Sequence, residues 1–330
     1  MKARRGIAML AALWLITAIT IVALEFAVSA HERRTLGLAA ADRGREQATA
    51  LGGLATMQAR MEYDLRNGST TLNATRGSDP WFGVDSTYSG TMYVDSLPVD
   101  VIAKDLGAVV NINTAQENDL RILFGYIIGN LTTADQLAAE IMDWRDVDDN
   151  ARNDGAERDQ YIKAGFLVLP ANGPFREVDD LIHLYSMTPE VLELIRPYVT
   201  THGTTQYKTN LNSAPEAVLR SLPGMTDQIL AQILALRSSG RRITSVNQVL
   251  TASNRGQNFQ VTGGRGGQPP TPQQARLQAT QAQLEQRVIV TTTDVELTFL
   301  VYNPARTQPT RLVAILNRAN NQANISWQLW

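Results

Sequence analysis

The sequence contains no cysteine, so neither disulfide bonds nor thiol chemistry contribute to its structure or function. An exported domain without disulfides must be held together by packing or by a metal ion. Histidine is scarce, and His31, His183 and His202 are so widely spaced that no transition-metal site built on imidazole is expected. The 30 basic side chains nearly balance the 32 acidic ones, which argues against a dedicated nucleic-acid surface.

Proline is missing before Pro80, and charge is missing between residues 7 and 24. An apolar helix of this length can cross most of the hydrocarbon core of a bilayer. The basic residues Lys2, Arg4 and Arg5 come before it, and they predict a cytoplasmic N-terminus with the rest of the chain exported.

Three interpretations compete for this N-terminal stretch. A secretory signal cut after Val28-Ser29-Ala30 fits poorly, because an ordinary signal has a shorter apolar region. A plain membrane anchor is the second. The third is a type IV pilin-like leader, in which a short basic leader ends in glycine and the apolar helix begins at once. Arg4-Arg5-Gly6-Ile7 looks like that junction, with cleavage between Gly6 and Ile7. On these residues alone, the anchor and the pilin-like leader both stay open.

The pattern after the apolar run remains helical to about Arg66. One continuous helix over 7–66 would measure about 90 Å. The alternative is a membrane helix followed by a separate soluble helix, with breaks at Gly44, Gly52 or Gly53.

The rest of the chain alternates between strand-like and helical regions. Residues 109–251 read as helical, and the Gly-, Gln- and Pro-rich residues 252–286 predict a flexible loop. Alternating apolar residues predict short strands on both sides of the helical region, with Pro98 as a break between the first two: 88–94, 99–102, 287–302, 311–316 and 325–330.

The helical region repeats itself. Asn111-Ile112-Asn113-Thr114-Ala115 resembles Asn210-Leu211-Asn212-Ser213-Ala214, and residues 175–181 resemble 243–249. Asparagine or serine before a helix start is capping chemistry. We therefore expect two related, all-helical units.

This layout resembles the K-type minor pseudopilin of type II secretion systems over nearly the whole chain. The resemblance includes the leader junction, the helical insert, Asn210–Ala214 and the motif Trp144-Arg145-Asp146-Val147-Asp148-Asp149. Most pilins and pseudopilins carry a glutamate where this chain has Ala11, and the K-type member lacks it. The bland alternative is that the chain is no pilin at all.

The resemblance implies a non-enzymatic subunit at the pseudopilus tip. It implies assembly with I- and J-type minor pseudopilins and other type II secretion components, and processing and methylation by prepilin peptidase. It also implies a single-pass inner-membrane anchor with a periplasmic head and no nucleic acid bound. The implied fold is α+β: a long pilin-like helix and a small antiparallel sheet, interrupted by the helical insert with helix-hairpin-helix-like modules. The expected segments are a leader (1–6), a membrane part (7–30), the helix and first strands of the head (31–108), the insert (109–251), the loop (252–286) and the last strands (287–330).

An acidic cluster is the best candidate site. Five oxygen-bearing side chains fall at positions 1, 3, 5, 9 and 12 of a twelve-residue loop, the ligand spacing of an EF-hand, with the Arg152 carbonyl at the backbone position. Ala151 replaces the usual glycine, so the prediction is a calcium-capable loop rather than a standard EF-hand. The alternative is a solvated acidic loop balanced by neighbouring arginines. The candidate ligands are Asp146, Asp148, Asn150, Asp154 and Glu157, with Asp143, Asp149 and Asp159 in reserve.

Two further sequence features suggest other functions. Leu222-Pro223-Gly224-Met225 resembles a helix-hairpin-helix turn, which in DNA-binding proteins offers backbone N–H groups to phosphate. The alternative to a pseudopilin is therefore an inner-membrane-anchored periplasmic helix-hairpin-helix protein that binds DNA or cell wall. A carboxylate-pair hydrolase using Asp146 and Glu157 has no recognisable nucleophile with its base, so no enzyme is predicted.

Overall fold

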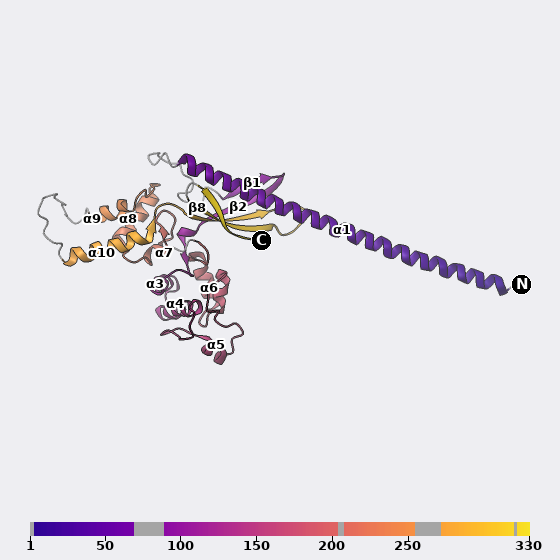
Figure 1. Ribbon diagram of the computed structural model, residues 1–330, viewed down its shortest axis with the longest axis horizontal. Coiled ribbons are helices and arrows are strands. Elements are labelled where there is room, and N and C mark those ends of the chain that lie inside the picture. Colours follow the sequence, from indigo (N-terminus) through magenta and orange to yellow (C-terminus); the bar gives the residue numbers. More distant parts are fainter. Residues whose placement is uncertain (1–2, 69–88, 204–207, 255–271, 320–321) are drawn as a thin grey trace.

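A computed structural model describes residues 3–68, 89–203, 208–254, 272–319 and 322–330. The first element, α1 (Ala3–Gly68), is one continuous helix of 66 residues, about 100 Å long (Figure 1). The single-helix prediction is thus confirmed, and none of the candidate glycines breaks it. The N-terminal half of α1 projects from the molecule, while the C-terminal half lies on the head (Figure 1).

The head contains a five-stranded antiparallel sheet of order β1-β2-β7-β8-β9. Its strands come from both sides of the helical insert, as expected: β1 (Gly90–Val94), β2 (Leu97–Asp105), β7 (Asp294–Val301), β8 (Thr310–Ala319) and β9 (Gln322–Leu329).

One stripe of α1 forms the core with this sheet. Ala50, Leu54, Met57 and Met61 recur at helical spacing and are buried against the inner side chains of β2, β7 and β8. Gly53 lies on the same side, and a Cβ atom there would sit 3.1 Å from the ring of Phe299. Glycine therefore lets the helix approach the sheet closely rather than breaking the helix.

A buried carboxylate fixes the end of the head from which α1 projects (Figure 1). Glu46 of α1 accepts hydrogen bonds from Asn303 (2.7 Å) and Thr310 and forms an ion pair with Arg306 (2.7 Å). Burial opposes its charge, but these donors hold the pKa of Glu46 below its ordinary value. The helix is thereby tied to the segment that joins β7 and β8.

The predicted break at Pro98 is wrong. Pro98 is the second residue of β2, opposite Tyr93, and its carbonyl accepts a hydrogen bond from the Tyr302 N–H. Proline is tolerated there because it stands at the beginning of the strand. The chain turns instead at Asp95 and Ser96, both of which have positive φ.

The insert lies between β2 and β7 and is largely helical. The prediction that it is all-helical is wrong, because it contains two short two-stranded sheets. Its elements are η2 (Leu106–Ala108), β3 (Val110–Asn111), α3 (Glu117–Ile128), α4 (Leu131–Arg145), α5 (Arg158–Ala164), η3 (Val178–His183), α6 (Pro189–Ile195), η4 (Arg196–Tyr198), β4 (Val199–Thr200), β5 (Thr209–Asn210), α7 (Glu216–Arg220), α8 (Asp227–Ser238), α9 (Asn247–Asn254), α10 (Pro272–Arg287) and β6 (Val288–Ile289).

The predicted flexible loop over 252–286 is wrong for its last part, because α10 occupies residues 272–287. Residues 255–271 lie outside the part of the chain that the structure describes. The insert also extends beyond its predicted end at 251, because β6 pairs with β5 in parallel. Leu284 is buried in the core of the insert, so α10 forms despite its Gln-rich sequence.

The expected duplication is visible in the hydrogen bonds. In the first repeat β3 pairs with β4 in parallel, and in the second β5 pairs with β6. Asn113 exchanges hydrogen bonds with the backbone of Phe175 and donates to the Thr201 carbonyl. Asn212 makes the same three bonds to the backbone of Ile243 and Val290. One asparagine thus joins three chain segments in each repeat.

A second pair of equivalent residues closes each helical hairpin. Arg145 at the end of α4 donates to the Ala115 carbonyl (2.8 Å), and Arg237 near the end of α8 donates to the Ala214 carbonyl (2.6 Å). The repeats then diverge. Residues 146–174 separate Arg145 from Phe175 in the first, whereas only residues 238–242 separate the equivalent pair in the second.

Buried polar contacts join the two repeats to each other and to the sheet. Asp105, at the end of β2, accepts hydrogen bonds from Asn210, Ser213 and Thr292, and Asp119 of α3 pairs with Arg287 of α10. Burial raises the pKa of Asp105, although its donors oppose that rise. These contacts connect the insert to the sheet at defined points.

Candidate functional site

The acidic loop between α4 and η3 is packed onto the helical core by aromatic side chains. Trp144, at the end of α4, stacks on Phe175 with ring centroids 5.3 Å apart. Tyr161 of α5 is fully buried and lies edge-on to Trp144 at 6.4 Å. These contacts hold both ends of the acidic segment, which fixes the positions of the carboxylates between them.

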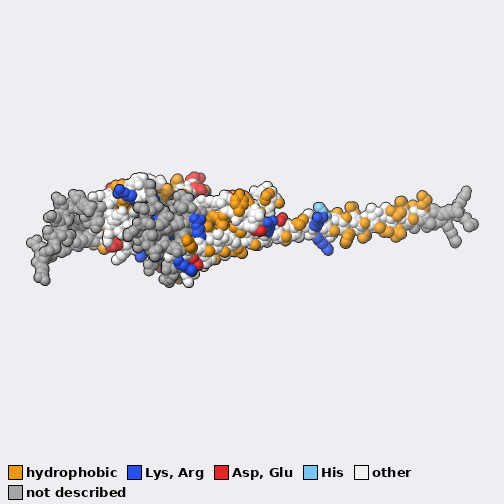
Figure 2. Space-filling model, turned by 90° about the horizontal axis from the view of Figure 1, so that it is seen from above, with side chains coloured by type: hydrophobic (Ala, Val, Ile, Leu, Met, Phe, Trp, Pro, Cys, Tyr) orange, Lys and Arg blue, Asp and Glu red, His pale blue; other side chains and the backbone are white. Residues whose placement is uncertain are grey.

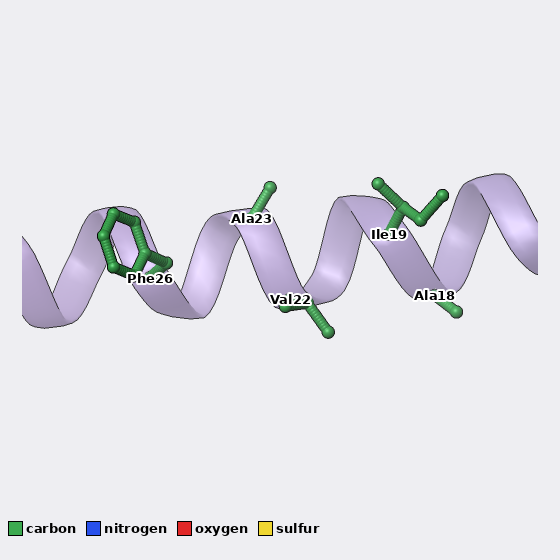
Figure 3. A pocket seen from close by; sticks show the side chains of 5 residues that line it. All are labelled: Ala18, Ile19, Val22, Ala23 and Phe26. Carbon is green, nitrogen blue, oxygen red and sulfur yellow. The ribbon is translucent and has the colours of Figure 1, made fainter.

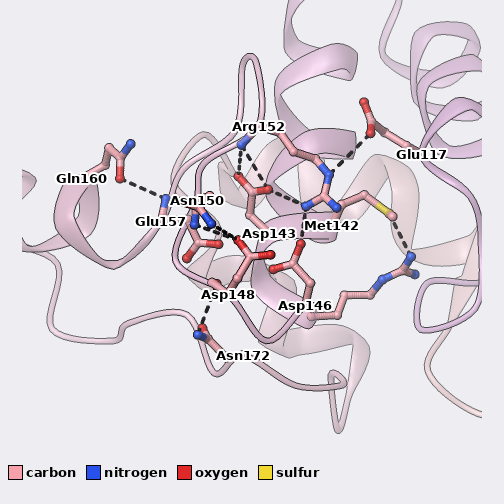
Figure 4. A network of polar contacts seen from close by, with 11 residues as sticks. Glu117, Met142, Asp143, Asp146, Asp148, Asn150, Arg152, Glu157, Gln160 and Asn172 are labelled. Carbon is pink, nitrogen blue, oxygen red and sulfur yellow. Dashed lines mark hydrogen bonds and ion pairs between the residues drawn. The ribbon is translucent and has the colours of Figure 1, made fainter.

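Arg152 stands among the carboxylates (Figure 4). Its guanidinium forms an ion pair with the buried Asp143 at 2.7 Å and another with Asp146, and it lies 3.8 Å from Glu117. The Arg152 N–H also donates to Asp143. Burial raises the pKa of Asp143, and the bonds from Arg152 counteract that effect.

Glu157 is the least compensated acid of the loop. Glu157 is 1 % exposed, and its carboxylate faces the backbone N–H of Gln160 as in a capping box. Neither oxygen, however, reaches hydrogen-bonding geometry with a donor among the described residues. One oxygen of Asp146, Oδ1, is likewise buried and unpartnered within that part of the chain. Burial, together with the charges of Asp143 and Asp146, raises the pKa of Glu157 to about 7, and the nearby Arg158 N–H opposes this rise only in part. A buried, unpaired carboxylate is costly and favours a bound cation or a proton.

The other predicted ligands do not share this environment. Asp148 accepts two bonds from Asn150, and Asp149 accepts one from Asn172, all on the exposed rim of the loop. Asp154 and Asp159 are exposed as well. The Arg152 carbonyl, expected as a backbone ligand, accepts a hydrogen bond from the Gly155 N–H.

Two features of the site fall outside the EF-hand spacing. Asp143 precedes the twelve-residue loop and was predicted only as a reserve ligand, although its side chain lies at the centre of the network (Figure 4). Gly155 is required by contact, because a Cβ there would lie 2.0 Å from Asp143 Oδ2. The signal available in the sequence was the acid one turn before the motif, on the buried face of α4.

The arrangement therefore fits a hard, oxygen-binding cation in part. Asp146 and Glu157 present three unpartnered oxygens of the kind that calcium prefers. Across the described residues, however, no group of three or more acids, histidines or cysteines is gathered closely enough to hold a metal ion. Backbone carbonyls, water or movement of the rim would have to complete the ligand set.

The predicted processing residues lie at the other end of the molecule. Gly6 and Ile7 belong to the first turns of α1, and their side chains lie outside what the structure describes. Among the described helices, α1 alone is long and apolar enough to cross a membrane, and its most apolar stretch is not covered by the head. A shallow hollow on this stretch is lined by five residues of α1, from Ala18 to Phe26 (Figure 3). Since one helix supplies the whole lining, the hollow is an exposed apolar surface rather than a binding pocket.

The helix-hairpin-helix-like turn is covered. Gly224, between α7 and α8, has φ +81°, and a Cβ there would lie 2.4 Å from the carbonyl oxygen of Thr280 in α10. The turn is thus packed against a helix of the same chain on the Gly224 side. This finding argues against DNA binding through residues 222–225.

Comparison with known proteins agrees with this architecture. Residues 105–203, which include the first repeat and its acidic loop, match the family described as type II secretion system protein K. The fold is similar to a chain of the crystal structure of the GspK-GspI-GspJ complex from the enterotoxigenic Escherichia coli type 2 secretion system, with a TM-score of 0.59. The family match covers this first part of the insert, and the structural similarity covers the fold of most of the chain.

The similarity of this chain to the solved one lies in the fold rather than the sequence. The two are 16 % identical, and the alignment covers 87 % of this chain and 98 % of the other. No curated protein sequence matches the chain. The resemblance to the K-type family, and the α+β fold that it implies, are thus confirmed.

Proposed function

We propose that this K-type protein caps the pseudopilus, assembled with I- and J-type minor pseudopilins during export of folded proteins across the outer membrane. Its role is structural rather than enzymatic. Its anchor crosses the inner membrane once, and its head lies in the periplasm. The observation that carries this proposal is α1 itself, since the head covers only one side of its C-terminal half (Figure 1).

The uncovered side of α1 suits packing against other helices. Leu51 is 44 % exposed, and a Cβ at Gly44 or Gly37, one and two heptads before it on the same side, would meet nothing within 4 Å. Figure 2 shows hydrophobic side chains along the projecting length of the helix. Small residues beside exposed leucines allow helices to approach closely. The matched structure is a GspK-GspI-GspJ complex, so I- and J-type subunits are the proposed partners here.

The tip position follows from bulk and from the N-terminal sequence. The insert projects sideways from the head, away from α1 (Figure 1), and leaves little room for a further subunit stacked above. Ala11 replaces the acid that in other pilins is thought to neutralise the N-terminal ammonium of a neighbour within the membrane. A terminal subunit has no neighbour above it that needs this charge, so we expect one copy per pseudopilus.

Processing tests the pilin-like leader. Prepilin peptidase should cleave between Gly6 and Ile7, so N-terminal sequencing of the mature protein should begin at a methylated Ile7. A Gly6→Leu substitution should block cleavage. Retention of Met1 in the mature protein, or a start at His31, would overturn the pseudopilin proposal.

Co-purification tests the partners. The full-length chain, extracted in detergent, should form a complex with full-length I- and J-type subunits. Substituting Gly44 by Phe on the free side of α1 should weaken that complex. Phe at Thr56, an exposed position that the helical repeat places on a different side of α1, is the control for side-chain size. Failure of the parent chain to bind either subunit would contradict the proposed assembly.

We also propose that calcium binds the acidic loop through Asp146 and Glu157. Bound calcium would satisfy the three unpartnered oxygens and stabilise the folded state by mass action. Elemental analysis should find calcium, and the melting temperature should rise with calcium relative to a chelator. Asp146→Asn should abolish that rise, whereas Asp159→Asn, at an exposed position of α5, should keep it. Equal melting in calcium and chelator, with no ion detected, would overturn this proposal.

A further inference from the structure

The two edge strands of the sheet, β1 and β9, differ in length and in how well their outer edges are protected from pairing with another strand. At one edge, β1 has only five residues and begins with Gly90. It leads into a turn where Asp95 forms an ion pair with Arg45 of α1. At the other edge, β9 has eight residues, and among the described residues it pairs only with β8. The edge at β9 is therefore longer, and apart from the Ala323 carbonyl, which accepts a bond from Gln58 of α1, its outward backbone groups have no strand partner among the described residues.

The sequence of β9 does nothing to protect this edge. Residues 322–330 contain no charged residue, no proline and no glycine. Proteins normally shield an exposed edge strand with such residues, with a covering element or by keeping the strand short. An unprotected edge of this length promotes pairing with another strand.

Apolar side chains are exposed on both faces of this strand. Ile325 lies opposite Leu316, whose side chain belongs to the core under α1, and is 44 % exposed. A register shift between Ile315 and Leu316 reverses the alternation along the strand. Leu329, opposite Val313, consequently lies on the other face and is 43 % exposed. A strand paired with β9 would cover apolar surface on both faces as well as the free backbone.

We propose that β9 binds an extended strand from a neighbouring pseudopilin head and so enlarges the sheet across the subunit interface. Because β9 is uncharged, the bound strand should be uncharged and carry apolar side chains. Gln58 of α1 donates to the Ala323 carbonyl of β9 at 2.7 Å. Gln58 lies seven residues after Leu51, on the same side of α1, so the strand edge continues the helix surface proposed for the I- and J-type subunits.

Hydrogen exchange on the full-length chain in detergent tests this inference, which rests on the proposed function for the identity of the partner. Adding full-length I- and J-type subunits should slow exchange of the amides in 322–329 by about tenfold or more. Exchange in β1 should not change. The outcome is read on the unaltered protein, so it does not depend on whether a variant folds.

Substitutions in β9 then measure how much this edge strand contributes to the affinity for the I- and J-type subunits. Ile325→Lys with Leu329→Lys should weaken the complex by about tenfold or more, because two charges would have to be buried in the interface. The matched control is Tyr93→Lys, which removes a 75 % exposed apolar side chain from the other edge strand. It should leave the affinity unchanged.

The outcomes separate the two proposals. A complex that forms while exchange in 322–329 stays the same would overturn the strand pairing and leave the partner assignment standing. Absence of any complex would overturn both. Protection of 322–329 in the chain alone that increases with its concentration would identify a second copy as the occupant and contradict this inference.

Discussion

The two repeats of the insert share a framework and differ in what is attached to it. Both use one asparagine to join three chain segments and one arginine to close the helical hairpin. The first repeat then inserts the acidic loop where the second has only residues 238–242. The second instead has its hairpin turn covered by α10. The shared asparagine and arginine contacts therefore account for the common fold of the repeats. The inserted acidic loop accounts for the candidate ligand site, which only the first repeat has.

The largest effect should come from breaking the framework. Asn113→Ala and Asn212→Ala each remove three hydrogen bonds and leave backbone groups unpaired. We expect each to lower the free energy of unfolding by about 4 kcal/mol. Chemical denaturation should show equal losses, with the exposed Asn153→Ala as the control. A large loss in one repeat alone would show that the two asparagines are not equivalent.

Replacing the glycine of each helical hairpin turn by alanine should destabilise the second repeat more than the first. Gly224→Ala places a Cβ against Thr280 at a residue with positive φ, so we expect a loss of about 3 kcal/mol. Gly129→Ala, in the turn between α3 and α4, meets no atom within 4 Å and should cost only about 1 kcal/mol for its backbone conformation. Thermal melting of both variants tests this difference. Equal losses would mean that α10 does not press on the second turn.

Substituting Glu157 in the acidic loop should change the stability of the protein in opposite directions without and with calcium. In a chelator at pH 8, Glu157→Gln removes a buried, unpaired charge and should stabilise the protein by about 1–2 kcal/mol. With calcium present, the same variant should lose the stabilisation that the parent gains. Melting with and without calcium measures both signs. A variant that is less stable in chelator would show that Glu157 has a partner in the metal-free protein.

The pH dependence sharpens the same test. The pKa of Glu157 is raised to about 7 in the folded state, above the value of about 4.5 expected when unfolded. The folded protein therefore binds more protons between these values, and its metal-free stability should fall as pH rises from about 5 to 7. Glu157→Gln should flatten that slope, and its advantage over the parent should disappear near pH 5.

The smallest effect should come from the exposed arginines at equivalent places in the repeats. Arg121 pairs with Asp135, and Arg220 pairs with Glu216 and Asp227, all at the surface. Ion pairs in water contribute little to stability. We expect Arg121→Gln and Arg220→Gln to leave the melting temperature unchanged within error. A clear loss in either would show that its ion pairs are coupled to the core.

The sequence by itself determined the features that depend on local pattern. The uncharged run at 7–24 and the lack of proline specified the long helix, because helix formation depends on neighbouring residues. The repeated Asn-x-Asn motif located both units of the insert, and alternation located the strands, although the turn at Asp95 and Ser96 was not recognised.

Only the tertiary structure decided the features that depend on contacts between distant residues. The Gln-rich α10 is weakly apolar, and the burial of Leu284 in the insert accounts for a helix where composition predicted a loop. The acidic motif predicted five ligands from spacing, with Asp143, Asp149 and Asp159 in reserve. Packing buried Glu157 and left Asp154 and Asp159 exposed, and it placed the reserve ligand Asp143 at the centre of the network. Spacing along a chain does not determine which oxygens are removed from water, because that depends on the helices and aromatic rings that pack around them.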